Sequence, residues 1–126
     1  MAYVYDDENI FARILRGEIP NKTVLETEHS LAFHDIRAQA PVHVLVIPKG
    51  RYVAADHFGA EASDAEIVDF TRTLARLCSD LGVSPAGDGA GFRLIANAGE
   101  HGAQEVPHYH VHLLGGRPLG RMLDRA

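Results

Sequence analysis

The spacing of apolar residues along the chain predicts two helices. Residues 9–16 place apolar side chains three and four positions apart, and Gly17 and Pro20 then end the pattern. A longer helix begins at a capping box in residues 63–66 and keeps one apolar face until Gly82. Each segment therefore has one side that must pack against another part of the protein.

Five short apolar runs predict strands. They are rich in β-branched and aromatic residues, and polar, glycine or proline residues separate them. They cover residues 23–26, 31–36, 42–47, 92–96 and 108–114. Because the long helix falls between the third and fourth runs, the order indicates an α+β fold with helices covering one face of a sheet. The nearly continuous apolar character of residues 42–47 favours strong burial, and a homodimer is the expected assembly.

Composition narrows the class of protein. A chain of 126 residues, 46% of them hydrophobic, fits a single domain over residues 1–126. The net charge of -5 argues against nucleic acid as a partner, although a small phosphate ligand needs only a few local donors. Cys78 is the only cysteine, which fits a reducing compartment. The acidic N-terminus and the lack of an apolar run of roughly 20 residues predict no signal peptide and no membrane partner, so we expect a cytoplasmic protein.

Three histidines occupy alternate positions in the last predicted strand. Because successive side chains of a strand point to opposite faces, His108, His110 and His112 would project to the same side. A neutral imidazole can attack phosphorus while a neighbouring imidazole carries a proton. Three imidazoles and a water can also form a catalytic zinc site. The residue types alone leave both chemistries open.

Four blocks of the sequence carry a family resemblance. They are residues 10–20, 32–36, 39–41 and, most specifically, 102–117, which contain the motif His-Tyr-His-Val-His. With these blocks the chain resembles the histidine triad family of nucleotide hydrolases and transferases, in particular its phosphoramidase branch. The resemblance implies a five-stranded antiparallel sheet with two helices, joined to a second subunit in a continuous ten-stranded sheet. Residues 116–126 would form a C-terminal tail that approaches the partner's active site.

The resemblance also implies an activity. His110 would attack the α-phosphorus of a nucleoside 5′-phosphoramidate and cleave its P–N bond through a nucleotidyl-histidine intermediate, releasing a nucleoside monophosphate and an amine. His112 would help protonate the leaving group, His108 would orient the central ring, and Asn97 would contact the phosphate. The substrate would be a purine nucleotide, derived from AMP or GMP, and neither a metal nor a cofactor would be required.

A nucleotide pocket follows from the same resemblance. Asp35 would accept hydrogen bonds from the ribose hydroxyls, since a carboxylate has two acceptor oxygens; an ordinary turn aspartate is the alternative. Apolar residues would enclose the base, with plain core packing as their alternative. The other residues assigned to nucleotide binding are Ile10, Phe11, Ile14, Phe33, His34, Ile36, Glu105 and Val106.

Two positions depart from what the family often carries. Arg51 stands where several relatives have an additional active-site histidine, and an arginine cannot act as a base although it could pair with phosphate. Glu105 stands where animal relatives often carry serine, and its charge would favour an amine over an anionic leaving group.

Three other functions remain open at this point. One is a dinucleoside polyphosphate hydrolase of the same family, and another is a nucleotide-binding or scaffolding protein with incidental hydrolysis. The third is a metal enzyme, for which His101 and Glu105 lie near the triad in sequence.

Overall fold

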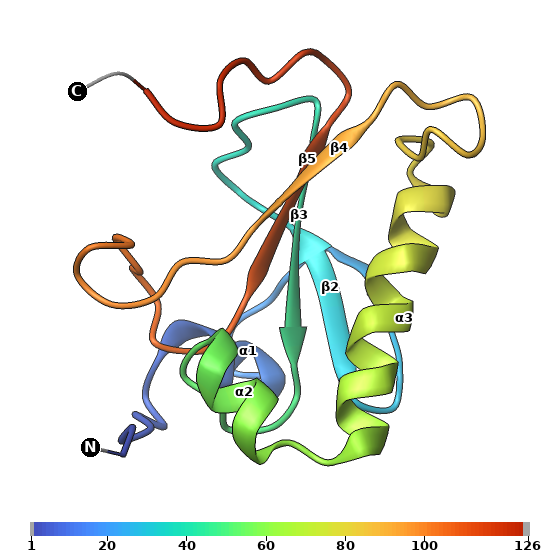
Figure 1. Cartoon of the computed structure of the whole chain (residues 1–126). Coiled ribbons are helices and arrows are strands. Elements are labelled where there is room, and N and C mark those ends of the chain that lie inside the picture. Colours follow the sequence, from blue (N-terminus) through green and yellow to red (C-terminus); the bar gives the residue numbers. More distant parts are fainter. Residues whose placement is uncertain (1, 125–126) are drawn as a thin grey trace.

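The protein folds around one five-stranded antiparallel sheet (Figure 1). The structure, a computed structural model, describes residues 2–124, so the last two residues of the expected tail lie outside it. The strands are β1 (Thr23–Glu26), β2 (Ser30–His34), β3 (Val42–Pro48), β4 (Phe92–Ile95) and β5 (Val111–Gly115). They follow the order β1-β2-β3-β5-β4. The predicted five-stranded α+β architecture is confirmed, and β3 and β5 are neighbours inside the sheet.

Both predicted helices are present, and a third accompanies them. α1 (Ile10–Leu15) begins at Asn9, whose side chain accepts a hydrogen bond from the Ala12 N–H, and α3 (Asp64–Asp80) begins at the predicted capping box. The prediction lacked α2 (Ala55–Glu61). Its N-cap makes no side-chain bond and Phe58 is its only buried residue, so neither a cap nor an apolar stripe marks it in the sequence. Within residues 2–124, no helix is long and apolar enough to cross a membrane.

The helices lie on opposite faces of the sheet, so the expectation that they cover one face is wrong. On one face, α2 and α3 pack against Val44 and Val46 of β3. On the other face, α1 packs against Leu45 and Ile47. Alternate residues of β3 therefore meet different helices, which explains why this strand is buried without a break after Val42.

Two strand boundaries differ from the prediction by two residues or more, and both matter for the histidines. β5 begins at Val111 and not at residue 108, because the N–H of Tyr109 donates to the Tyr52 carbonyl at 2.7 Å and not to a neighbouring strand. β2 ends at His34, because the Asp35 carboxylate accepts the Arg37 N–H at 2.8 Å and turns the chain. The segment before β5 is therefore free to place its side chains outside the regular alternation of a strand.

Candidate functional site

The three histidines lie where β5 begins, on the face of the sheet that α1 covers. Phe11 of α1 meets the rings of His108 and His110 edge-on, with centroids 6.2 and 4.9 Å away. The rings of His110 and His112 are 5.1 Å apart. His108 and His110 are buried and His112 is half-buried. The structure thus brings the three imidazoles together, although only His112 belongs to a strand.

The ring of His110 has its two nitrogens in different roles. Its Nδ1 lies 2.7 Å from the carbonyl oxygen of His108. Because a carbonyl oxygen only accepts, Nδ1 carries the hydrogen of the neutral ring, and Nε2 is left with its lone pair. Burial lowers the pKa of His110, against the opposing effects of this hydrogen bond and of the charges of Asp35 and Glu105. His110 is therefore a neutral imidazole with an unprotonated Nε2 near pH 7.

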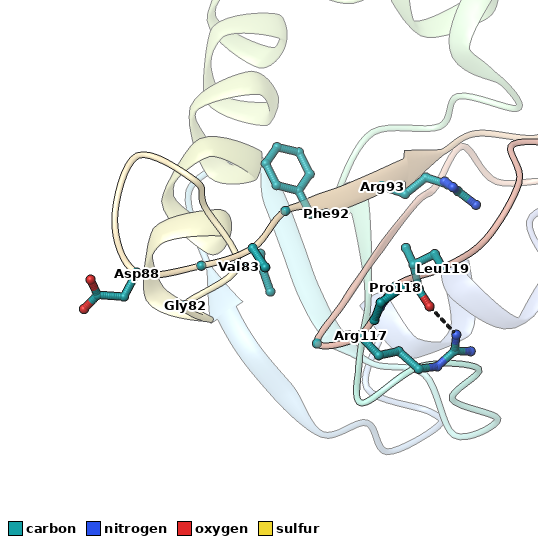
Figure 2. A pocket seen from close by; sticks show the side chains of 12 residues that line it. Gly82, Val83, Asp88, Phe92, Arg93, Arg117, Pro118 and Leu119 are labelled. Carbon is teal, nitrogen blue, oxygen red and sulfur yellow. Dashed lines mark hydrogen bonds between the residues drawn. The ribbon is translucent and has the colours of Figure 1, made fainter.

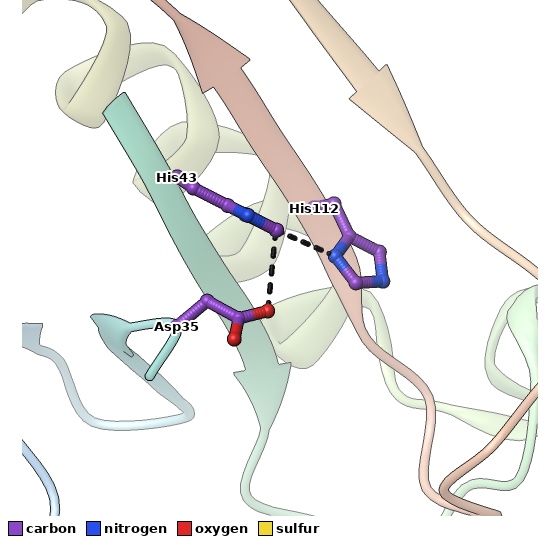
Figure 3. A group of neighbouring side chains, drawn as sticks. All are labelled: Asp35, His43 and His112. Carbon is purple, nitrogen blue, oxygen red and sulfur yellow. Dashed lines mark hydrogen bonds and ion pairs between the residues drawn. The ribbon is translucent and has the colours of Figure 1, made fainter. Parts of the chain in front are cut away.

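A fourth histidine, His43 of β3, fixes the proton on His112 (Figure 3). The backbone N–H of Gln39 donates to Nδ1 of His43 at 3.0 Å, so in the neutral ring Nε2 carries the hydrogen. That Nε2 lies 2.9 Å from Nδ1 of His112 and 3.3 Å from a carboxylate oxygen of Asp35. His112 accepts at Nδ1, and its own hydrogen is consequently on Nε2, where it can be donated to a ligand.

The sequence analysis missed His43, although part of a signal was present. His43 alternates with Leu45 and Ile47, so it lies on the same face of β3 as the residues that α1 covers. In the sheet register Leu45 lies opposite His112, which brings His43 beside the triad. The pairing of β3 with β5 joins segments far apart in the sequence, and the hydrophobic pattern does not specify it.

Burial also sets the protonation of the two histidines around His110. Burial, together with the neighbouring His110 and His43, lowers the pKa of His112 to about 4, against the opposing charge of Asp35. Burial lowers the pKa of His43 as well, and the nearby Asp35 raises it. The group around the nucleophile candidate therefore consists of neutral imidazoles at pH 7.

The side chains that could bind a metal in the structure are not the three histidines of the motif. Among residues 2–124, the one group of three candidate ligands is Asp35, His43 and His112, whose ligand atoms lie within 4.8 Å of one another. His108 is not part of it, because its Nε2 bonds to the Pro48 carbonyl at 2.8 Å and its Nδ1 bonds to Tyr5 at 2.6 Å. A three-imidazole zinc site built from the triad alone therefore does not match this geometry.

The residues assigned to the base-binding pocket divide into two groups. Phe11, Ile14 and Phe33 are buried in the cluster between α1 and the sheet, and Val106 packs against that cluster. Ile10 and Ile36 are exposed, Ile36 at 92% of its surface. The first group therefore belongs to the core between α1 and the sheet, whereas the two isoleucines face solvent.

The polar residues assigned to the nucleotide differ in how far they are buried. Asp35 is half-buried beside His43, whereas His34 and Glu105 are exposed. Asn97 is half-buried in the segment that follows β4. His101, the additional ligand considered for a metal, is exposed.

Arg51 does not hold a free guanidinium toward the triad. Its Nε and one terminal nitrogen each lie 2.9 Å from a different carboxylate oxygen of Asp7, and the guanidinium lies over the Tyr5 ring at 5.1 Å. Tyr5, which the sequence analysis did not single out, donates its hydroxyl hydrogen to Nδ1 of His108. Arg51 thus binds the N-terminal segment, and the suggestion that it pairs with phosphate finds no support in this arrangement.

A cavity of about 640 Å³ lies away from the triad, between the loop that follows α3 and the C-terminal tail (Figure 2). Two arginines of its lining hold the tail by donating to backbone carbonyls. Arg93 bonds to the carbonyls of Gly120 and Arg121, and Arg117 bonds to those of Pro118 and Gln39. Both arginine guanidiniums of the lining already bind backbone carbonyls. They are therefore less available to an anionic ligand than the presence of two arginines in the lining would indicate.

The burial of neutral histidines predicts a loss of stability in mild acid. An unfolded histidine titrates near pH 6.5, whereas the folded His108 has a pKa of about 4. Between these values only the unfolded chain takes up the proton, so the stability is fully present above pH 6.5 and is lost as the pH falls toward 4. We expect His108 alone to lower the free energy of unfolding by about 2.4 kcal/mol between pH 7 and 4.5, measured by chemical denaturation.

The variant His108→Asn provides the control, because asparagine does not titrate. Its stability should fall less steeply over the same interval. An equal fall in the native protein and in the variant would contradict the assignment of a buried neutral His108.

Comparisons with known proteins agree with this fold and site. The HIT domain model matches residues 16–119. A HIT-like protein of Azospirillum brasilense is 53% identical over 125 residues, which is 99% of each chain. The purine nucleoside phosphoramidase of Escherichia coli strain K12 is 41% identical over 117 residues, covering 93% of this chain and 94% of that protein.

Solved structures give the same result. A HIT family hydrolase from Legionella pneumophila superposes with a TM-score of 0.75 at 37% identity, covering 88% of this chain and 95% of that one. A histidine triad protein from Clostridium difficile has a TM-score of 0.78 at 32% identity, covering 95% and 100%. The chain therefore belongs to the HIT domain family and shares its fold with hydrolases of that family.

Proposed function

We propose that the protein is a purine nucleoside phosphoramidase that cleaves the P–N bond of AMP or GMP phosphoramidates. The observation that carries the proposal is the tautomer of His110, whose Nδ1 donates to the His108 carbonyl at 2.7 Å and leaves Nε2 free to attack. The Escherichia coli relative, a purine nucleoside phosphoramidase at 41% identity, supports this choice of substrate.

The reaction proceeds in two displacements at phosphorus. In the first, Nε2 of His110 forms a bond to the α-phosphorus, the P–N bond breaks, and the departing nitrogen takes the proton from Nε2 of His112. The negative charge left on the His112 ring is balanced by the positive charge of the nucleotidyl-His110 ring until the second displacement restores both. In the second, water attacks the phosphorus of the nucleotidyl-histidine, the bond to His110 breaks, and the proton of the water returns to His112. The sum is one phosphoramidate and one water converted to a nucleoside monophosphate and an amine, with no metal or cofactor taking part.

Other side chains bind the rest of the substrate. Asp35 accepts from the ribose hydroxyls, because its two oxygens retain lone pairs beyond those used by Arg37 and His43. Ile10 and Ile36, both exposed, contact the purine base. Asn97 contacts the phosphate, and the Glu105 carboxylate favours an amine leaving group.

We also propose that two copies join through β4 into a ten-stranded sheet. β4 is an edge strand, so one side of its backbone is available for pairing. Phe92 and Leu94 on this strand are 41% and 42% exposed, which is unusual for apolar side chains in a sheet whose β3 is buried at every position after Val42.

The first experiment measures single-turnover hydrolysis of adenosine 5′-phosphoramidate in EDTA and follows the protein by mass. We expect the native chain to form a nucleotidyl adduct, and His110→Ala to abolish the adduct and to lower the rate by about a thousandfold or more. His29→Ala, in the turn between β1 and β2, is the matched control and should react normally.

The outcomes separate the alternatives. Activity that persists in His110→Ala would remove this residue as the nucleophile, and activity lost in EDTA would point to a metal bound by Asp35, His43 and His112. Binding of AMP with no turnover would indicate a nucleotide-binding protein. Faster turnover of a dinucleoside polyphosphate than of the phosphoramidate would identify the other branch of hydrolases.

A second prediction concerns His43. His43→Phe removes the hydrogen that Nε2 donates to Nδ1 of His112, so His112 no longer holds its proton on Nε2 alone. We expect the rate of adduct formation to fall by about ten- to a hundredfold while AMP binding, measured by calorimetry, changes little. His29→Phe is the control. A normal rate in a folded His43→Phe protein would exclude His43 from proton transfer.

A third prediction tests the assembly. Leu94→Lys places a charge on the exposed face of β4, where desolvation would oppose burial against a second copy. We expect the native protein to sediment as a dimer and this variant to sediment as a monomer. Val68→Lys, which changes an exposed apolar residue of α3, should remain dimeric. A native monomer, or a dimer that survives Leu94→Lys, would refute pairing through β4.

A further inference from the structure

Residues 3–9, which we name the N-terminal strap, are fixed beside the triad by three side chains. Tyr3 donates to both carboxylate oxygens of Asp56 in α2, at 2.7 and 2.9 Å, and its ring stacks on His57. Asp7 holds the Arg51 guanidinium, as described above. Tyr5, between them, is the one of the three that reaches a triad residue.

Tyr5 is placed to remain a hydrogen-bond donor. Its hydroxyl oxygen lies 2.6 Å from Nδ1 of His108, whose Nε2 already donates to the Pro48 carbonyl. With its only hydrogen on Nε2, the neutral His108 must accept at Nδ1. Burial raises the pKa of Tyr5, so the hydroxyl keeps its proton at neutral pH. The Arg51 guanidinium lies over the Tyr5 ring, 5.1 Å from its centroid, and helps to hold the ring in place.

The backbone carbonyl of His108 connects the position of His108 to that of His110. The carbonyl of His108 is the acceptor for Nδ1 of His110, at 2.7 Å, and this bond sets both the tautomer and the direction of the His110 ring. The position of that carbonyl depends on how the His108 residue is held. Its side chain is held at one nitrogen by Pro48 and at the other by Tyr5.

We propose that Tyr5 is a positioning residue for His110, acting through His108. It touches neither the substrate nor the reacting atoms, and its effect on rate rests on the function proposed above. Among the buried side-chain nitrogen and oxygen atoms of the described residues, none lacks a hydrogen-bond partner. Removing the Tyr5 hydroxyl would leave Nδ1 of His108 without a hydrogen-bond partner. The His108 ring would then move or bind a water molecule, and the His110 ring would be held less precisely.

The test compares Tyr5→Phe with Tyr3→Phe. Each variant removes one hydroxyl from the strap and keeps the aromatic ring, but only the first hydroxyl bonds to a triad residue. Single-turnover rates, AMP binding and thermal midpoints are measured for both. In parallel, nitrogen NMR of labelled histidines follows the titration of His108, whose ring faces the Tyr5 hydroxyl and the His110 imidazole.

We expect Tyr5→Phe to lower the rate of adduct formation about tenfold with AMP affinity nearly unchanged, since the nucleophile and not the binding site is affected. The titration of His108 should shift in this variant, because the ring loses its hydrogen-bond partner at Nδ1. Tyr3→Phe should change neither the rate nor this titration.

Two results would overturn the proposal. One is an unchanged His108 titration in Tyr5→Phe, and the other is an equal loss of rate and thermal stability in both variants, which would make the strap a purely structural element. If the native protein does not hydrolyse the phosphoramidate, the proposed function fails separately. The titration of His108 and the tautomer of His110, both read by NMR without substrate, then decide the role of Tyr5.

Discussion

A buried imidazole has two ring nitrogens, and each of them needs a hydrogen-bond partner. This requirement organises the whole site. His108 satisfies it with the Pro48 carbonyl and Tyr5, and His43 satisfies it with the Gln39 N–H and His112. The Pro48 carbonyl can only accept and the Gln39 N–H can only donate, so these two backbone groups decide where the hydrogens of both rings lie. His110 is the exception that matters, because its Nδ1 is satisfied by backbone while no group among residues 2–124 bonds to its Nε2.

The same burial determines the charge of the site. Four histidines, including His43 and His108, have a lowered pKa, and desolvation is the largest cause for each of them. The nucleophile candidate therefore needs no separate base to remove a proton from it. A phosphate entering this site would meet neutral N–H donors instead of a cluster of cations. Such a site is compatible with a chain whose net charge is -5, since local donors suffice for one small anion.

The sequence was sufficient for what depends on local pattern. Strand positions, the α3 capping box and the histidine motif all follow from residues close together in the chain, and the structure has them. The sequence was insufficient where distant segments meet. His43 joins the site only through the β3–β5 pairing, and Tyr5 joins it only because the strap folds back over a residue 103 positions away. The start of β5 was misplaced for a related reason, since Tyr109 bonds to the Tyr52 carbonyl, and no local rule reveals that partner.

The two faces of the sheet explain how a polar cluster can occupy the middle of a small protein. Val44 and Val46 give one face of β3 to the core beneath α3, so most of the apolar burial does not depend on the triad side. The opposite face carries His43 and Leu45. On that face, Phe11 belongs to the same apolar cluster as Leu45, and its ring meets the ring of His110 edge-on. A prediction that put both helices on one face would have left these imidazoles in water with ordinary pKa values. Phe11 of α1 covers the rings of His108 and His110 and excludes water from them, so the short first helix contributes to the chemistry as well as to the core.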